Sequence, residues 1–373
     1  MNRRAILWWL LGACTAAPAW SEETIPYRAP GQVPSGYPAD YAKTIAAAEE
    51  EGALVVYSNT DLAVARPLVE DFQSLYPRIE LDYQDLNATQ LHHRYLAENG
   101  LGHDSADALW SSAMDLQMSL VEKGYAQTYA SPERAALPSW AVWRDQAFGT
   151  TFEPVVIAYN RQAVAAAEVP QAHEDLARLL QAGGDRWRGR VVSYDVERSG
   201  LGYLLATQDA AASAAYWDLV RALGVAGTRF QLTTDAMLRA LARGNAHIAH
   251  NALGAYVMRA ARADTAIGYV LPRDYTLVMT RTAFISRRAQ HPHAARLWLD
   301  YLLSRRGQQL IADRAQLFAL RDDVAGATTA AGLMQLAGER LRPIPLDSAL
   351  ARSLDEPARH DFLRRWRMAL GKR

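Results

Sequence analysis

The chain has 373 residues, of which 50% are hydrophobic and 21% are charged, a balance typical of a soluble globular protein. Forty basic and 40 acidic residues give a formal net charge of zero. This balance excludes the strongly basic surface that binds nucleic acid, so no nucleic-acid partner is expected. The length exceeds that of most single cores and favours two lobes.

The first residues have the pattern of an export signal. Arg3 and Arg4 precede the apolar run 5–13, and Ala17-Pro18-Ala19 resembles a cleavage site. A signal peptide over residues 1–19, a linker over 20–39 and a periplasmic location are therefore predicted. Secretion by the general or by the twin-arginine route remains open.

Cys14 is the only cysteine of the chain and lies inside this signal. It either leaves with the cleaved peptide or ends a lipoprotein signal and becomes a lipid anchor. In both cases the folded body carries no thiol, which excludes disulfides and cysteine catalysis there.

The first part of the body repeats one pattern. After a helix over 40–51, the apolar run 53–57 stops at Ser58-Asn59-Thr60 and a helix follows. About fifty residues later the strand 106–110 stops at Ser111-Ser112, again before a helix. Such alternation indicates a parallel α/β sheet, whose ligands bind beyond the carboxyl ends of the strands. Free N–H groups at a helix start suit anions.

Further along the chain, the segment 150–160 is extended and contains Pro154, which a central strand would not accept easily. A second strand–helix unit follows between residues 174 and 250, and the segment 292–313 is an amphipathic helix.

Six segments between Gly52 and Asp313 together resemble one family: VVYSNTD, DALWSSAMDLQ, GTTFEPVVIAYN, YDVERSGLGYLLATQD, YVLPRDYTLVM and ARLWLDYLLSRRGQQLIAD. They are similar to the periplasmic solute-binding proteins of ABC-type uptake systems, in the branch that binds iron(III) or phosphorylated solutes. The resemblance implies the two-lobed α/β fold of periplasmic binding proteins. Each lobe would be a mostly parallel sheet flanked by helices, hinged by two crossing segments. Lobe one would comprise 40–150 plus 275–373, and lobe two 151–274.

The polar residues at the two strand ends are candidates for ligand binding. Ser58, Asn59 and Thr60, together with Ser111 and Ser112, offer hydroxyl and N–H groups for a carboxylate or phosphate oxygen. The alternative is ordinary helix capping, for which Ser, Thr and Asn are common residues. The resemblance favours binding.

In lobe two, Arg198, Ser199 and Gly200 are the corresponding candidates for ligand binding. Glycine lets the backbone approach a ligand closely, and an arginine fork can neutralise an anion. The alternative pairs Arg198 with Asp195 or Glu197 on the surface, where ion pairs contribute little.

Iron-binding members of the family have two adjacent tyrosines near the position of Asn251 and Tyr256, but this chain has no Tyr-Tyr pair. Bare iron is therefore disfavoured, and Asn251 and Tyr256 suit hydrogen bonds to a polar organic solute. A core role for Tyr256 remains open.

The functional hypothesis is an exported binding protein without catalysis, metal or cofactor. As a monomer, it would capture a small anionic solute, phosphorylated or carboxylated. It would deliver this solute to ABC permease membrane subunits or to the periplasmic domain of a sensor kinase. Ferric iron or a ferric chelate is the alternative ligand. An exported hydrolase is the alternative class, although the sequence has no G-x-S-x-G or HExxH motif.

Overall fold

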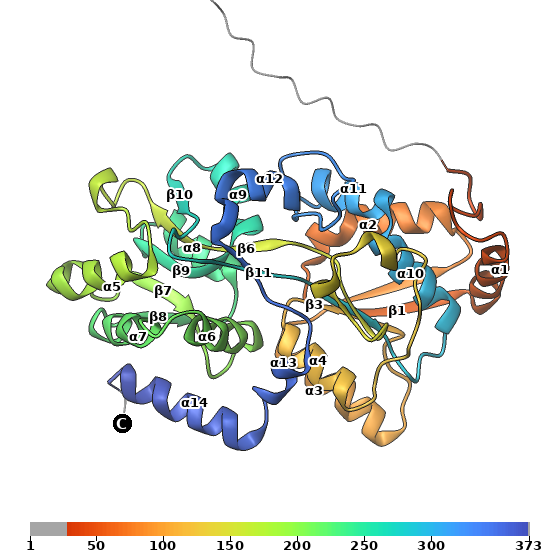
Figure 1. Ribbon diagram of the computed structural model, residues 1–373, viewed down its shortest axis with the longest axis horizontal. Helices are drawn as coiled ribbons and strands as arrows, with labels where there is room; N and C mark the ends of the chain where they lie inside the picture. Colours follow the sequence, from red (N-terminus) through yellow and green to blue (C-terminus); the bar gives the residue numbers. More distant parts are fainter. Residues whose placement is uncertain (1–27, 372–373) are drawn as a thin grey trace, which may run out of the picture.

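The computed structural model describes residues 28–371, which fold into two lobes lying side by side (Figure 1). Within this range the first lobe has a six-stranded sheet in the order β2-β1-β3-β12-β5-β4. The second has a seven-stranded sheet in the order β13-β11-β6-β9-β7-β8, with β10 paired to β6. The predicted signal peptide 1–19, including Cys14, lies outside the described residues, as does the linker before residue 28. In the described part no helix is long and apolar enough to cross a membrane.

The first lobe begins with strand–helix–strand units. β1 lies between β2 and β3 and is parallel to both, because a helix returns the chain across the sheet after each strand. The left-handed Gly52 (φ 70°) ends α1 and lets β1 start at the next residue. The elements of this lobe are α1 (Tyr41–Glu51), β1 (Ala53–Ser58), α2 (Leu62–Leu75), β2 (Glu80–Asp85), α3 (Ala88–Leu101), β3 (Ala108–Ser111), α4 (Met114–Glu122), η1 (Arg134–Ala136), η2 (Ser139–Ala141), β4 (Val142–Trp143), β5 (Ala147–Gly149), β12 (Thr282–Ile285), α10 (Pro292–Leu303) and α11 (Arg305–Asp313).

The second lobe follows the same plan, with β7 parallel to both β8 and β9. All residues of β9 are buried, which fits a strand covered on both faces by helices. The elements of this lobe are β6 (Glu153–Asn160), η3 (Ala166–Glu168), α5 (His173–Ala182), η4 (Gly184–Trp187), β7 (Val191–Tyr194), α6 (Gly200–Ala212), α7 (Tyr216–Val225), β8 (Arg229–Gln231), α8 (Thr234–Ala242), β9 (Ile248–Leu253), α9 (Gly254–Ala263), β10 (Ile267–Val270) and β11 (Thr276–Met279).

Two crossing segments join the lobes, as expected. Residues 150–152 lead from β5 to β6, and residues 280–281 lead from β11 back to β12. They run side by side in opposite directions, since the Thr150 N–H donates to the Arg281 carbonyl at 2.9 Å. Each segment continues into a strand in both sheets. β12 is therefore antiparallel to β5, and β6 is antiparallel to β11. Both sheets are consequently mixed rather than mostly parallel.

The C-terminal part visits both lobes. Its elements are α12 (Ala330–Ala337), η5 (Gly338–Arg340), β13 (Leu341–Pro343), α13 (Ser348–Arg352) and α14 (Glu356–Ala369). β13 pairs with β11 in the second sheet, α13 packs on α4 of the first lobe, and α14 packs on α7 of the second. The assignment of all of 275–373 to lobe one is thus wrong for β11, β13 and α14. Strand pairing and the apolar face of α14 place these three segments in the second lobe.

Candidate functional site

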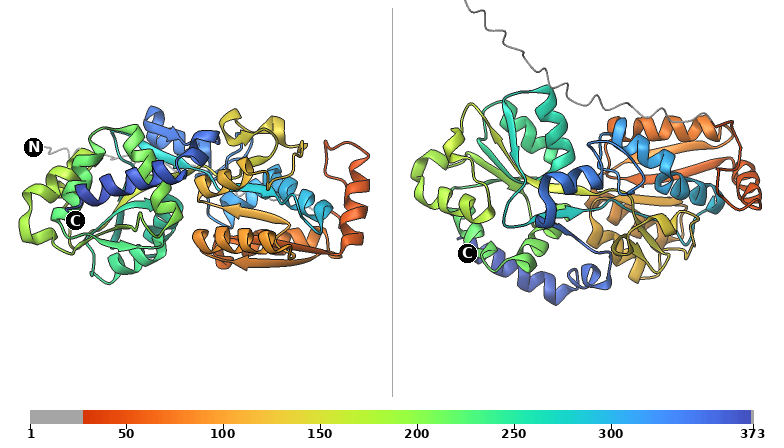
Figure 2. Two further views of the ribbon diagram at one scale, coloured as in Figure 1. Left: turned by 90° about the horizontal axis from the view of Figure 1, so that it is seen from below. Right: turned by 45° about the horizontal axis from the view of Figure 1, so that its top comes forward.

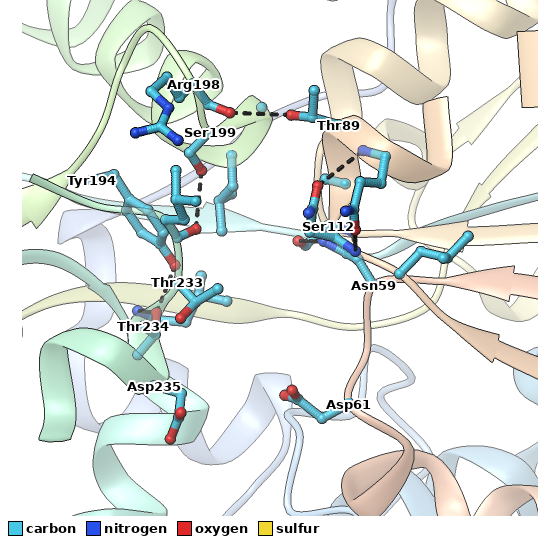
Figure 3. Close-up of a pocket in the computed structure, with 18 of the residues that line it drawn as sticks. Asn59, Asp61, Thr89, Ser112, Tyr194, Arg198, Ser199, Thr233, Thr234 and Asp235 are labelled. Atoms are coloured by element: carbon cyan, nitrogen blue, oxygen red, sulfur yellow. Dashed lines mark hydrogen bonds between the residues drawn. The ribbon is translucent and has the colours of Figure 1, made fainter. Parts of the chain in front are cut away.

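A cavity of about 890 Å³ lies between the two lobes, next to the crossing segments (Figure 3). Its walls come from the loops that follow β1, β2 and β3 in the first lobe. In the second lobe they come from the loops that follow β7, β8 and β9. The carboxyl ends of parallel strands thus point at one space from both sides, which is where α/β proteins bind ligands.

Helix N-termini converge on this cavity. The starts of α2 and α3 line it from the first lobe, and the starts of α6, α8 and α9 line it from the second. The first N–H groups of a helix have no partner within the helix and carry the positive end of its dipole. A cavity that receives several such ends favours a ligand with negative charge.

Asn59 and Ser112 form the first-lobe wall. The Asn59 amide donates to the Ser112 hydroxyl at 2.7 Å and accepts the Ser112 N–H at 2.9 Å. Both residues line the cavity (Figure 3). The structure therefore joins the two polar turns that the sequence singles out.

Ser58, Thr60 and Ser111 lie behind this wall and do not line the cavity. The Ser58 hydroxyl donates to the Trp110 carbonyl at 2.8 Å, and the Ser111 hydroxyl accepts the Ala113 N–H at 3.2 Å. Thr60 accepts a hydrogen bond from Arg281 at 2.7 Å. All three are buried and already partnered, so they shape the loops and are not available to a ligand in this arrangement.

Arg198, Ser199 and Gly200 line the cavity from the second lobe. Ser199 is the N-cap of α6, since its hydroxyl accepts the Gly202 N–H at 3.2 Å. Capping and a place in the cavity wall are therefore compatible. The Arg198 carbonyl accepts a hydrogen bond from Thr89 of the first lobe at 3.3 Å, directly across the cavity (Figure 3).

The suggested ion pairs of Arg198 are replaced by other contacts. The Asp195 carboxylate accepts the backbone N–H groups of Glu197 and Arg198, both at 3.0 Å. Glu197 forms an ion pair with Arg367 of α14.

Gly200 lies where the start of α6 packs closely on α4 of the first lobe. A Cβ atom at this position would be 2.6 Å from the Leu116 Cδ1 atom of α4. The glycine therefore lets the start of α6 approach the first lobe.

Tyr256 of α9 also links the lobes. Its hydroxyl donates to the Asp61 carboxylate at 2.6 Å, and both residues line the cavity. Burial raises the pKa of Tyr256 above its usual range; Arg281 opposes this shift, and Asp61 adds to it. The phenol is therefore protonated and already has an acceptor.

Arg281 forms the floor of the cavity between the lobes. It lies on the second crossing segment, and its side chain is 1% exposed. The guanidinium donates to Glu153 at 2.7 Å and to Thr60 at 2.7 Å. Burial alone would lower the pKa of Arg281, but Glu153 and Tyr256 more than offset this effect, and the pKa is raised.

The structure does not place Asn251 at the cavity. Its amide donates to the buried Asp209 carboxylate at 2.6 Å, and its backbone is left-handed with φ 59°. Asparagine tolerates this conformation better than most residues. Asn251 thus lies in the core and away from the cavity in this structure, and its role in binding stays a prediction.

Several residues that line the cavity are not predicted from the sequence: Asp61, Thr89, Arg94, Thr233, Thr234 and Asp235. Thr233 is the N-cap of α8, and its hydroxyl accepts the Ala236 N–H at 3.1 Å. The sequence Gln-Leu-Thr-Thr-Asp has the same strand-to-helix pattern as the turns that were singled out, so this signal was present. Figure 3 shows Asp61 and Asp235 on opposite sides of the same space.

The family described as bacterial extracellular solute-binding protein matches residues 54–314. The chain belongs to this family. The substrate-binding protein of an ABC transporter from Agrobacterium tumefaciens is 34% identical, with a TM-score of 0.81 over 85% of this chain and 94% of that one. The protein is therefore a substrate-binding component of ABC transport with the two-lobed α/β fold. No curated protein sequence matches the chain.

Two more distant structures share the fold of this solute-binding protein. The periplasmic binding protein AfuA from Actinobacillus pleuropneumoniae, with fructose-6-phosphate bound, is 16% identical. Its TM-score is 0.73, over 86% of this chain and 99% of that one. Iron-bound HitA from Pseudomonas aeruginosa is 17% identical, with a TM-score of 0.65 over 85% and 99%.

Proposed function

We propose that this solute-binding protein captures a small anionic solute, phosphorylated or carboxylated, by closing its lobes around the cavity. The observation that supports this proposal most directly is that helix N-termini from both lobes converge on one cavity of about 890 Å³. This volume is typical of sites for small molecules. N–H groups at these ends, the amide and hydroxyl of Asn59 and Ser112, and the guanidinium of Arg198 would hold the anion.

A phosphorylated organic solute is favoured over a bare ferric ion. AfuA, which shares the fold, has fructose-6-phosphate bound, whereas HitA has iron bound. A ferric centre needs ligands that give up their protons, but the Tyr256 phenol donates to Asp61 and its pKa is raised. A ferric chelate such as ferric citrate remains the second candidate, because it would present carboxylates to the same N–H groups.

We infer that the protein is exported and acts as a monomer that delivers the solute to ABC permease subunits. Membership of the family supports the permease as the partner. Delivery to a sensor kinase would use the same closed lobes. Anchoring through Cys14 would require cleavage before that residue, which mass spectrometry of the mature protein would show.

We infer further that the protein binds without turning its ligand over. This inference rests on family membership and on the cavity residues, among which hydroxyls and amides are hydrogen-bonded to neighbours. Incubation with phosphorylated sugars and measurement of released phosphate would test it, and release above that of a boiled control would overturn it.

A thermal-shift screen tests the ligand class. Phosphorylated sugars, phosphoglycerates, di- and tricarboxylates, ferric citrate and inorganic phosphate would be compared. A compound at a hundred times its Kd stabilises the protein by about 2.7 kcal/mol, which gives a clear rise in Tm.

Arg198→Gln should reduce that rise, because the variant loses a cation of the cavity wall. Arg262→Gln is the matched control, since Arg262 is exposed on α9 and does not line the cavity. A response to ferric salts alone would refute the anionic organic ligand. An equal loss of response in both variants would refute the role of Arg198.

A further inference from the structure

The C-terminal segment 348–369 also joins the two lobes. We call it the strap: helix α13, a joint at residues 353–355, and helix α14. In Figure 1 it passes below the helices α4 and α6, and Figure 2 shows α14 lying along the second lobe. The strap lies outside residues 54–314, which the family profile matches.

The strap is firmly attached to the second lobe. Leu363 and Trp366 of the strap, and Leu370 directly after it, are buried in the apolar core that contains α7. The Arg365 guanidinium lies 3.9 Å from the centre of the Trp217 indole ring. The Leu370 carbonyl packs so closely on Gly224 of α7 that no Cβ atom would fit there.

The attachment to the first lobe buries fewer large apolar side chains. α13 has five residues, and Leu350 is its one fully buried side chain. The helix packs on α4, and the preceding segment is held by the Leu346 N–H, which donates to the Trp140 carbonyl at 2.8 Å. Two buried leucines at this end, Leu346 just before α13 and Leu350 within it, compare with three large apolar side chains at the other end, so α13 is the end that detaches more easily.

The joint of the strap holds α6. The Tyr203 hydroxyl donates to the Ser353 carbonyl at 2.6 Å, and the Arg359 guanidinium lies 5.3 Å from the centre of the Tyr203 ring. α4 and α6 are the helices that approach each other at Leu116 and Gly200 beside the binding cavity. The strap therefore connects α6, which lines the binding cavity, with α4, which packs beside it.

Space between the strap and the cavity walls allows these walls to move. A second cavity of about 970 Å³ lies between α3, α4, α6 and the strap. It shares Thr89, His93, Arg198, Ser199 and Gly200 with the binding cavity. The strap thus spans the seam between the lobes without filling it.

We propose that the strap limits how far the lobes open, and that α13 must leave α4 before they can open widely. Residues 353–355 carry no helix and form the point where the strap bends. Loss of the α13 contact increases the open population. The strap thereby sets how much binding energy is used to close the lobes. The smaller the closed fraction of the free protein, the weaker the apparent affinity.

Distance measurements without any ligand test the proposal. The full chain, with Cys14→Ser, would carry spin labels at Glu70→Cys on α2 and Ala263→Cys on α9, both exposed positions. Double electron–electron resonance would give the distance distribution between the lobes. Leu350→Ala should add a longer-distance population several-fold larger than in the parent. Met368→Ala is the matched control, because Met368 lies on the strap but is 71% exposed.

Tyr203→Phe decides the question if Leu350→Ala fails to fold by circular dichroism. This variant loses only the hydroxyl that donates to Ser353, and it should shift the distribution in the same direction by less. An unchanged distribution in folded Leu350→Ala and in Tyr203→Phe would overturn the proposal. Because no ligand is present, this failure is distinct from a failure of the anionic-solute proposal.

Discussion

Arg281 and Glu153 form an ion pair at the floor of the cavity, and both side chains are almost completely buried. Arg281 lies on the second crossing segment, and Glu153 begins β6 directly after the first, so the pair holds the two crossing segments together. Thr60 extends the contact to the end of β1. A buried charge whose partner is removed is far more costly than an intact pair.

Arg281→Met should therefore lower the free energy of unfolding by about 3–5 kcal/mol, because it leaves Glu153 buried without its cation. Urea denaturation followed by circular dichroism measures the loss. The double variant Arg281→Met/Glu153→Leu should recover much of it. A double variant that is no more stable than the single one would contradict this interpretation.

Asp115 makes the free energy of unfolding depend on pH, and the direction of this dependence follows from its pKa. Burial raises the pKa of Asp115 to about 7; hydrogen bonds from backbone N–H groups and the charge of Arg359 oppose the shift. The unfolded value is near 3.9, so the folded form binds the proton more tightly. The contribution of this tighter proton binding to the free energy of unfolding is complete below about pH 4 and is lost as the pH rises to about 7.

Asp115→Asn should become progressively more stable than the parent between pH 5 and pH 7, by about 1.4 kcal/mol for each pH unit. The amide oxygen can still accept the Leu116 N–H, so the helix start is kept. Urea denaturation at several pH values measures the difference. Asp322→Asn, at an exposed position, is the control and should show no such trend. A difference that is independent of pH would refute the raised pKa.

At the scale of elements, the cavity depends on helices that start next to strand ends. α6 and α4 approach each other at Gly200, where a side chain would meet Leu116. The closeness of these two helices determines how completely the lobes can enclose a ligand.

Gly200→Ala should weaken binding of the compound found in the screen by about tenfold, since overpacking costs about 1–3 kcal/mol. Isothermal titration would measure the Kd. The double variant Gly200→Ala/Leu116→Ala should restore affinity, because it removes the clashing group. A Kd that stays unchanged in the single variant would show that the lobes do not meet here in the bound form.

Much of this arrangement was predictable from the sequence, and the exceptions have physical reasons. The strand ends at Asn59 and Ser112 were recognised because an apolar run changes abruptly to hydroxyl and amide residues. Ser58 and Ser111 were not separable from their neighbours, since a strand buried on both faces does not show which side a residue takes. The position of Asn251 away from the cavity is not predictable, because its left-handed backbone leaves no mark in the sequence.

The C-terminal region shows a different limit of prediction from the sequence. α14 is amphipathic, but its apolar face fits either lobe, and only the three-dimensional contacts with α7 decide between them. The same holds for β13, whose partner β11 is distant in the sequence.

At the scale of the whole molecule, the lobes share structure beyond the hinge. One apolar core contains Val56 and Trp110 of the first lobe together with Tyr194 and Leu253 of the second. The two crossing segments and the strap connect the same two lobes. We expect the lobes to unfold together.

Hydrogen exchange in increasing urea should therefore give the same opening free energy for β3 in the first lobe and β9 in the second. Both strands are completely buried and will exchange only through large openings. Mass spectrometry of the corresponding peptides measures these values. Two clearly different free energies would show that one lobe unfolds while the other stays intact.

The position of Arg281 on the crossing segment has a kinetic consequence. A body that rotates about an axis moves least near the axis and most at the far edge. The floor around Arg281 and Tyr256 would thus change shape less on opening than the contact between Thr89 and Arg198, which lies away from the crossing segments. A solute would first settle on a floor that is already built, at a rate governed by diffusion and charge. Its residence time would then depend on how often the lobes open, which breaks the hydrogen bond between Thr89 and Arg198 and is limited by the strap.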